Sequence, residues 1–269
     1  MKTEGSANSS GNGKLAMPIG CQVWPLRAML DDFPSFAKKL ADIGVSRLEL
    51  CSPIGFGEEF ASLSDAKEVK KILEDHGMRA ESSHFSLDEL RNCHGKSIDW
   101  AKEIGITQMI TATLGARGAT PSLDDVKKAA EEYNAIAAAS AKAGLQQGLH
   151  NEDFEHAMVG GKRAYDLLFD LLEPDLVKFQ FQMSAIAVGL VAADYFLRHP
   201  GRFYSIHVQD VDMDAPGEGK KPQVAVGQGS IDWVKTFEAA KTGGVKNYFV
   251  EQNWELTQAS VAALKAMSL

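Results

Sequence analysis

The chain has 269 residues, a formal net charge of -8 and 45% hydrophobic residues, which fits one large folded domain. It contains no run of basic residues, so nucleic acid is not an expected partner. No apolar stretch approaches the ~18 residues that a membrane-spanning helix needs. The chain has three cysteines, Cys21, Cys51 and Cys93. They are too few and too irregularly spaced for a disulfide framework or a zinc motif.

The first 14 residues, MKTEGSANSSGNGK, are polar and rich in Gly, Ser and Asn. This composition predicts a disordered tail over residues 1–14, followed by a single domain over residues 15–269. The tail is not a signal peptide, because no apolar segment follows Lys2. An export signal already removed by cleavage would leave no trace, so both the cytoplasm and the periplasm remain open.

The rest of the chain repeats one unit, in which an amphipathic helix is followed by a glycine and a short apolar strand. FAKKLADIG-VSRLEL and DWAKEIG-ITQMITAT are two examples, and the glycines of the six joints are Gly44, Gly77, Gly105, Gly144, Gly201 and Gly244. Glycine takes the left-handed conformation that commonly ends a helix. Together with PIGCQVW and LVKFQFQ, the joints predict strands near residues 18–23, 46–50, 78–83, 107–112, 145–149, 176–181, 203–208 and 246–251.

The alternation of strand and helix predicts a parallel sheet whose two faces are both buried. Such units repeated over about 250 residues favour a single closed (β/α)8 TIM barrel. The rival architecture is an open doubly wound sheet, which would be supported by a GxGxxG motif after the first strand. The sequence has no such motif at that place.

Ligands of (β/α)8 barrels bind at the C-terminal ends of the strands. Nearly every expected strand ends in polar residues, which are Glu49, His84, Thr111, Thr113, His150, Asn151, Glu152, Gln180, Gln182, His207, Gln209, Asp210, Glu251, Gln252 and Asn253. His150, His207 and Glu251 can point into one barrel mouth, where imidazole and carboxylate suit Mn²⁺, Zn²⁺, Fe²⁺ or Co²⁺. Alternatively, each is a hydrogen-bonded group that caps a loop, although burying several together without a ligand is costly.

Two further segments carry candidate residues. His156 follows HNEDFE and is expected in a loop at the barrel mouth. The segment VAVGQGSIDW (224–233) enters a helix, and its Gly227 and Gly229 allow the backbone to approach a ligand closely. The alternative for this loop is structural, with Ser230 or Asp232 capping the following helix.

These motifs together resemble the sugar phosphate isomerase/epimerase family of xylose-isomerase-like barrels, over the chain from Pro18 to the C-terminus. HNEDFE (150–155) is similar to the family's HNHxxEF, and the resemblance extends to HPGRFYSIHVQD (199–210), VGQGSIDW (226–233) and NYFVEQN (247–253). The family includes isomerases, epimerases, dehydratases and lyases. The resemblance therefore implies a barrel that acts on a small carbohydrate, without naming one reaction.

Members of the family commonly hold one divalent metal with Glu, Asp, His and Glu from strands five to eight. Carried over position by position, this implies a Mn, Zn, Mg, Fe or Co ion held by His150, Gln182, His207 and Glu251. His150 and Gln182 depart from the pattern, which leaves Glu251 as the single carboxylate of the set. We expect Glu251 and His150 to be catalytic, with substrate contacts from Glu49, His84, Asn151, Glu152, Gln180, Asp210 and Gln228.

A single carboxylate favours a reaction with one base, in which Glu251 or a metal-bound hydroxide removes a proton next to a carbonyl and an enediolate forms. The leading hypothesis is a metal-dependent isomerase/epimerase of a keto sugar or sugar derivative. The alternatives are a lyase or dehydratase that eliminates from a 3-keto sugar or glycoside, and a non-catalytic sugar-binding barrel without metal. A metal-dependent endonuclease would need more His and acidic ligands and a basic DNA-binding face. Exposed helix faces are compatible with a homodimer.

Overall fold

The computed structural model describes residues 18–116, 118–217 and 220–267, and eight strands of this described part close into an all-parallel barrel. In barrel order they are β1 (Ile19–Gln22), β2 (Arg47–Cys51), β3 (Arg79–Phe85), β4 (Gln108–Thr111), β5 (Gln146–Leu149), β8 (Val177–Gln182), β9 (Phe203–Val208) and β12 (Asn247–Val250). The expected (β/α)8 TIM barrel and the positions of its strands are confirmed. The expected tail, residues 1–14, lies outside the described residues, as do residues 15–17.

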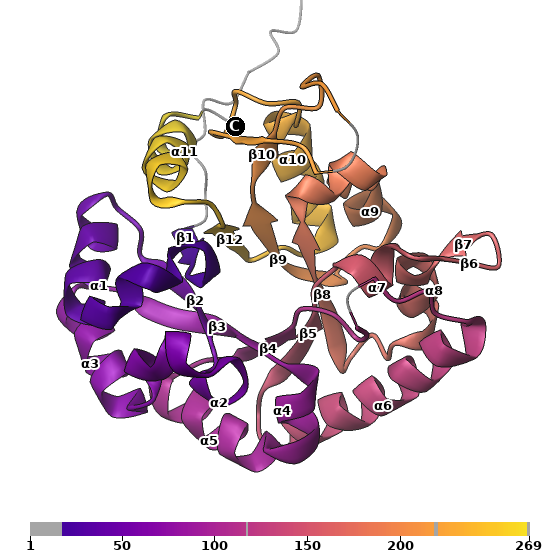
Figure 1. Ribbon diagram of the computed structural model, residues 1–269, viewed down its shortest axis with the longest axis horizontal. Helices are drawn as coiled ribbons and strands as arrows, with labels where there is room; N and C mark the ends of the chain where they lie inside the picture. The colour runs from indigo at the N-terminus through magenta and orange to yellow at the C-terminus, as the bar shows by residue number, and fades with distance from the viewer. Residues whose placement is uncertain (1–17, 117, 218–219, 268–269) are drawn as a thin grey trace, which may run out of the picture.

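Helices surround the barrel, and Figure 1 shows the indigo start of the barrel at β1 beside its yellow end at β12. The outer helices are α1 (Phe33–Asp42), α3 (Ala66–Asp75), α5 (His94–Ile104), α6 (Leu123–Lys142), α8 (Ala164–Leu171), α9 (Ala192–Arg198), α10 (Trp233–Gly243) and α11 (Trp254–Ala266). Within the described ranges, no helix is both long and apolar enough to span a bilayer.

Short elements connect several strand ends to the outer helices, and they build the rim of the barrel mouth. They comprise the α-helices α2 (Pro53–Phe56), α4 (Leu87–Asn92) and α7 (Asp153–His156) and the 3-10 helices η1 (Trp24–Asp32), η2 (Glu58–Leu63) and η3 (Met183–Val188). Two small antiparallel pairs also follow strand ends, namely β6 (Met158–Val159) with β7 (Lys162–Arg163) and β10 (Asp210–Val211) with β11 (Gln223–Val224).

The six glycines of the repeated joints all have positive φ, between 67° and 100°. Gly105 illustrates the role, because it ends α5 with a φ of 100° and its N–H donates to the Ala101 carbonyl. A side chain at this φ would be strained, so glycine allows the helix to stop and the next strand to start three residues later, at Gln108. The repeated sequence unit thus sets where six of the barrel strands begin.

The barrel interior contains a layer of buried polar side chains near the C-terminal ends of the strands. Val, Ile and Leu usually fill the interior of such barrels. Here Glu49 pairs in register with Ser82, and Gln180 pairs with Ser205, and all four side chains are buried. A polar layer at this depth needs internal hydrogen bonds, and it forms the base of the candidate site.

Candidate metal centre and active site

Glu49, on β2, lies fully buried beneath the barrel mouth and contacts four side chains. Its carboxylate accepts hydrogen bonds from Ser82 Oγ and from Gln180 Nε2 at 2.7 Å, it contacts His207 Nε2, and it lies 3.2 Å from His84 Nε2. Burial alone would raise the pKa of Glu49, but the two histidines outweigh it and hold the pKa well below its usual range. Glu49 is therefore ionised, and protein side chains surround its carboxylate. Its contact with Nε2 fixes the orientation of the His207 ring.

Gln180, on β8, links the polar layer to the cavity above it. Its Oε1 lies 2.8 Å from His84 Nε2, and its Nε2 donates to Glu49 and to Ser205 Oγ, at 2.7 and 2.8 Å. Both ends of the amide are thus used inside the protein. Gln180 positions His84, which is 6% exposed and reaches the cavity wall.

Three histidine rings meet at the C-terminal ends of β3, β5 and β9. The ring centroids of His150 and His207 are 4.5 Å apart, and His84 lies 5.5 and 5.2 Å from these two rings. Burial and the neighbouring histidines hold the pKa of His150 well below its usual value, so this ring is neutral. Burial would lower the pKa of His207, but Glu251 and Glu49 raise it to about 10.

Glu251 directly follows β12 and has one of the few carboxylates that reach the cavity, with 12% of its side chain exposed. Its Oε2 accepts from Gln182 Nε2 at 2.7 Å and from Gln209 Nε2 at 2.6 Å. His207 Nδ1 lies 3.1 Å from the same oxygen but outside hydrogen-bond geometry. Burial raises the pKa of Glu251, whereas His207 and Gln182 lower it by more, so the carboxylate is ionised.

Three of the four predicted metal ligands have a buried atom without a hydrogen-bond partner. Across the described residues eight buried side-chain atoms have no such partner, and three of them are His150 Nδ1, Gln182 Oε1 and His207 Nδ1. These residues lie at the ends of β5, β8 and β9, and Glu251 follows β12, so the four come from consecutive strands of the barrel. Unpaired buried polar atoms are costly, and one shared cation would satisfy all three once His207 has lost its proton from Nδ1.

The donor set therefore fits a divalent metal. Two imidazole nitrogens, one amide oxygen and one carboxylate suit first-row divalent ions and magnesium to different degrees. A second grouping is also possible, because His84, His150 and His207 each offer one ligand atom within 4.8 Å of the others. The two groupings share His150 and His207, so these two imidazoles are the common part of either site.

The cavity above the histidines has a volume of about 240 Å³ and is lined by Gln22, Trp24, Phe56, His84, Ala112, Glu152 and Glu251. The structure thus brings together His84, Glu152 and Glu251 from the sequence-based set. Reasoning from the sequence missed four of the lining residues. Gln22 ends β1 and follows the same strand-end rule, whereas Phe56 and Ala112 lie in connecting segments where no periodic pattern marks them.

Asp210 and Gln228, two predicted substrate contacts, are not among the residues that line this cavity. Asp210 is buried and accepts hydrogen bonds from the backbone or indole of Gly227, Gly229, Ile231 and Trp233. A Cβ atom at position 229 would lie 2.2 Å from the Asp210 carboxylate. Gly227 and Gly229 therefore let the backbone approach the Asp210 carboxylate closely. Gln228, between them, is exposed.

Residues of the HNEDFE segment connect the predicted metal ligands to the rim. Asn151 Oδ1 accepts from the backbone N–H of Gln182 at 2.8 Å, and its Nδ2 lies 3.3 Å from His156 Nε2. Burial, with a smaller contribution from a nearby arginine, lowers the pKa of His156 to about 4. Glu155, which was not singled out from the sequence, accepts hydrogen bonds from the backbone of Leu114 and of Glu152.

No protein-family model and no curated protein matches this sequence. Solved structures do match its fold. A sugar phosphate isomerase/epimerase from Parabacteroides distasonis is 22% identical, with a TM-score of 0.77 over 97% of this chain and 99% of that one. A probable 3-DHS dehydratase from Bacillus anthracis is 11% identical, with a TM-score of 0.71 over 92% and 98% of the two chains.

A third structure is a xylose isomerase-like TIM barrel protein from Mycobacterium smegmatis in complex with magnesium. It is 12% identical to this chain, with a TM-score of 0.69, and the match covers 93% of this chain and 96% of that chain. The three similarities extend over nearly the whole length of each protein. The chain thus has the same (β/α)8 barrel fold as these three proteins.

Proposed function

We propose that this chain is a metal-dependent enzyme that enolises a keto sugar or sugar derivative, with isomerase/epimerase as the leading reaction class. One observation carries the proposal: three buried atoms without partners lie on consecutive strand ends, and the next strand is followed by the ionised Glu251, which lines the mouth cavity. The similar structures, which include a sugar phosphate isomerase/epimerase and a magnesium complex, support the same class.

His150, Gln182, His207 and Glu251 would hold the metal. When bound, a divalent ion supplies Lewis-acid stabilisation of negative charge on a carbonyl oxygen. Glu251 takes the proton from the carbon next to that carbonyl, because it is an ionised carboxylate that reaches the cavity. Glu49 keeps His207 oriented through its contact with Nε2, so that Nδ1 remains directed toward Glu251.

Glu152 supports an isomerase/epimerase in particular. It lines the same cavity as Glu251, and the two carboxylates come from strand ends that are separated by β8 and β9. A proton removed by one carboxylate can then be replaced by the other on a different face of the substrate. Glu152 is not one of the four predicted metal ligands, among which Glu251 is the single carboxylate. It would therefore act as the second carboxylate of the site.

A lyase is the second candidate, and the 480 Å³ cavity that adjoins the mouth favours it. In a 3-keto glycoside, the base removes the proton at C2, a C1–C2 double bond forms and the bond between C1 and the glycosidic oxygen breaks. The departing oxygen takes up a proton, which gives an alcohol and an unsaturated keto sugar. The adjoining cavity offers room for the group that departs.

The test begins with the metal. We expect the purified protein to contain close to one divalent ion per chain, and removal by a chelator should lower Tm until Mn²⁺ is added back. Keto sugars and methyl 3-keto-β-D-glucoside incubated in D₂O should then gain deuterium next to the carbonyl only with the metal-loaded protein, as seen by NMR. Absence of metal, of any Mn²⁺ effect on Tm and of exchange would instead favour the non-catalytic sugar-binding barrel.

A further inference from the structure

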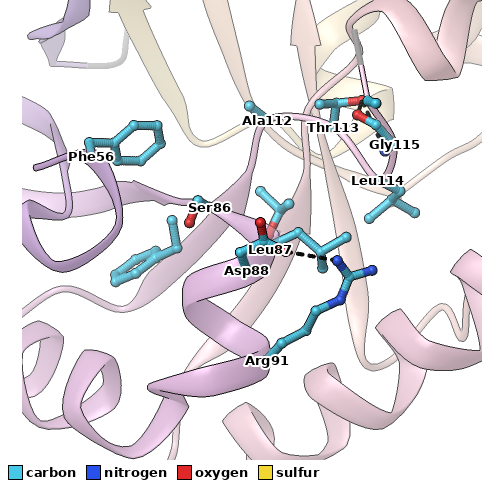
Figure 2. Close-up of a pocket in the computed structure, with 12 residues that line it drawn as sticks. Phe56, Ser86, Leu87, Asp88, Arg91, Ala112, Thr113, Leu114 and Gly115 are labelled. Atoms are coloured by element: carbon cyan, nitrogen blue, oxygen red, sulfur yellow. Dashed lines mark hydrogen bonds and ion pairs between the residues drawn. The ribbon is translucent and has the colours of Figure 1, made fainter. Parts of the chain in front are cut away.

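We propose that the cavity beside the mouth is a subsite for an uncharged ring carried by the sugar, either an aglycone or a second sugar; the inference rests on the proposed function. This cavity has a volume of about 480 Å³ and lies between α2, the N-terminal part of α4 and the segment after β4. Figure 2 shows Phe56 on one side and Thr113, Leu114 and Gly115 on the other, with Ala112 between them. Phe56 and Ala112 also line the mouth cavity, so the two spaces adjoin.

The sizes of the two cavities argue for a substrate larger than one small sugar. Ligand pockets typically measure about 300–1,000 Å³. The mouth cavity, at about 240 Å³, falls below this range, whereas the adjoining cavity lies well within it. A substrate held only above the histidines would leave the larger space unused, and a ring attached to the sugar would extend into it.

Two packed aromatic side chains form the wall where the two cavities meet. Trp24 lines the mouth, and Phe56 lines both cavities. The rings of Trp24 and Phe56 pack edge to face, with their centroids 5.6 Å apart, which fixes the part of the wall at the junction. Such a wall suits the apolar face of a sugar ring or an aromatic ring.

The charges at the cavity argue against an anionic substituent. Arg91 is the arginine that lines it, and its guanidinium is paired with Glu132 at 2.7 and 2.8 Å and with Asp88 at 2.9 Å. A phosphate or carboxylate would have to compete with these carboxylates. Ser86, Thr111 and Thr113 add hydroxyl groups to the lining, which suits hydroxyl-bearing or neutral rings.

The experiment compares three 3-keto-β-D-glucosides, whose substituent is methyl, phenyl or glucosyl, by NMR-detected turnover in D₂O with the Mn²⁺-loaded protein. We expect the phenyl or the glucosyl compound to have a kcat/KM at least tenfold above that of the methyl compound, and the better of the two identifies the ring. Leu87→Trp, which fills the proposed subsite, should lower this preference at least fivefold. Ala116→Trp, at the exposed rim of the same cavity, is a second variant if the first does not fold.

The matched control is Val191→Trp, which fills a different cavity of about 200 Å³ whose lining includes none of the proposed metal ligands or bases. It should leave the preference unchanged. Turnover of all three compounds at equal kcat/KM would overturn the subsite alone, as would a loss of preference in Val191→Trp but not in Leu87→Trp and Ala116→Trp. If none of the three compounds is turned over or exchanges a proton, the proposed function fails and the subsite fails with it.

Discussion

Replacing Glu49 with Gln tests whether a buried carboxylate behind His207 supports the metal centre. Glu49 is fully buried, ionised and in contact with His207 Nε2. Gln has the same shape but no charge, and its amide can turn a donor toward the imidazole, so the ring is no longer held with Nδ1 directed inward. Removing such an outer partner of a metal-binding His typically costs about 10–100-fold in metal affinity, or about 1.4–2.7 kcal/mol.

Isothermal titration of the metal-free protein with Mn²⁺ measures this effect as a rise in Kd. The matched control is Glu89→Gln, because Glu89 is also buried but accepts hydrogen bonds from Ser52 and Ser97 instead of contacting the histidines. Burial raises the pKa of Glu89, and its hydrogen-bonding partners are serine hydroxyls. Circular dichroism shows whether each variant is folded. Equal Mn²⁺ affinities for folded Glu49→Gln and the wild type would refute the role of Glu49.

Three further substitutions test separate parts of the reasoning. Glu251→Gln should lower proton exchange at least ~100-fold while the far-ultraviolet spectrum stays native, because the proposed base is lost; unchanged exchange would remove Glu251 from the reaction. His207→Ala should reduce the metal content measured by elemental analysis, and full occupancy would show that another residue is the ligand. Burial raises the pKa of Glu155 from 4.5 to about 7, so the folded state binds a proton more tightly and loses stability as pH rises through this interval. Between pH 5 and 8 the loss is about 2–3 kcal/mol, and Glu155→Gln should remove it; parallel urea midpoints for both proteins across this range would contradict the assignment.

The barrel could be predicted from the sequence because its evidence is local. Each joint combines an amphipathic helix, a glycine and an apolar strand, and Gly44 and Gly244 show the positive φ that the pattern requires. The strand order follows once eight such units are counted, because parallel neighbours connected by helices close in chain order. Neither step needs knowledge of contacts between distant residues.

The candidate site was predictable only in part, for a physical reason. All strands of a barrel end at the same mouth, so His150, Gln182, His207 and Glu251 were expected together, and the structure places them on consecutive strands. Position at a strand end does not determine where a side chain points. Asp210 lies three residues after His207, yet it turns away from the cavity to hold a loop.

Other features of the site depend on contacts between distant segments. Phe56 belongs to a short helix after β2 and Ala112 to the segment after β4, yet both line the mouth and the adjoining cavity. Glu155 connects the β4 and β5 loops through the backbone of Leu114. No periodic pattern marks these residues, because their roles depend on the packing of loops that are far apart in the sequence.

In the proposed metal centre, the distribution of charge accounts for Gln182 at a position where the family's pattern has an acidic ligand. An amide contributes a lone pair without charge, so the ligand set alone, with only Glu251 ionised, would leave a divalent ion undercompensated. Glu49 supplies the missing charge from behind His207, since it is ionised and in contact with that ring. Two carboxylates then balance a divalent ion, and Gln182 Nε2 donates to Glu251 at 2.7 Å, where a second carboxylate would repel it. Gln182 in place of an acidic residue is therefore compatible with metal binding, because the buried Glu49 carboxylate behind His207 supplies the second negative charge.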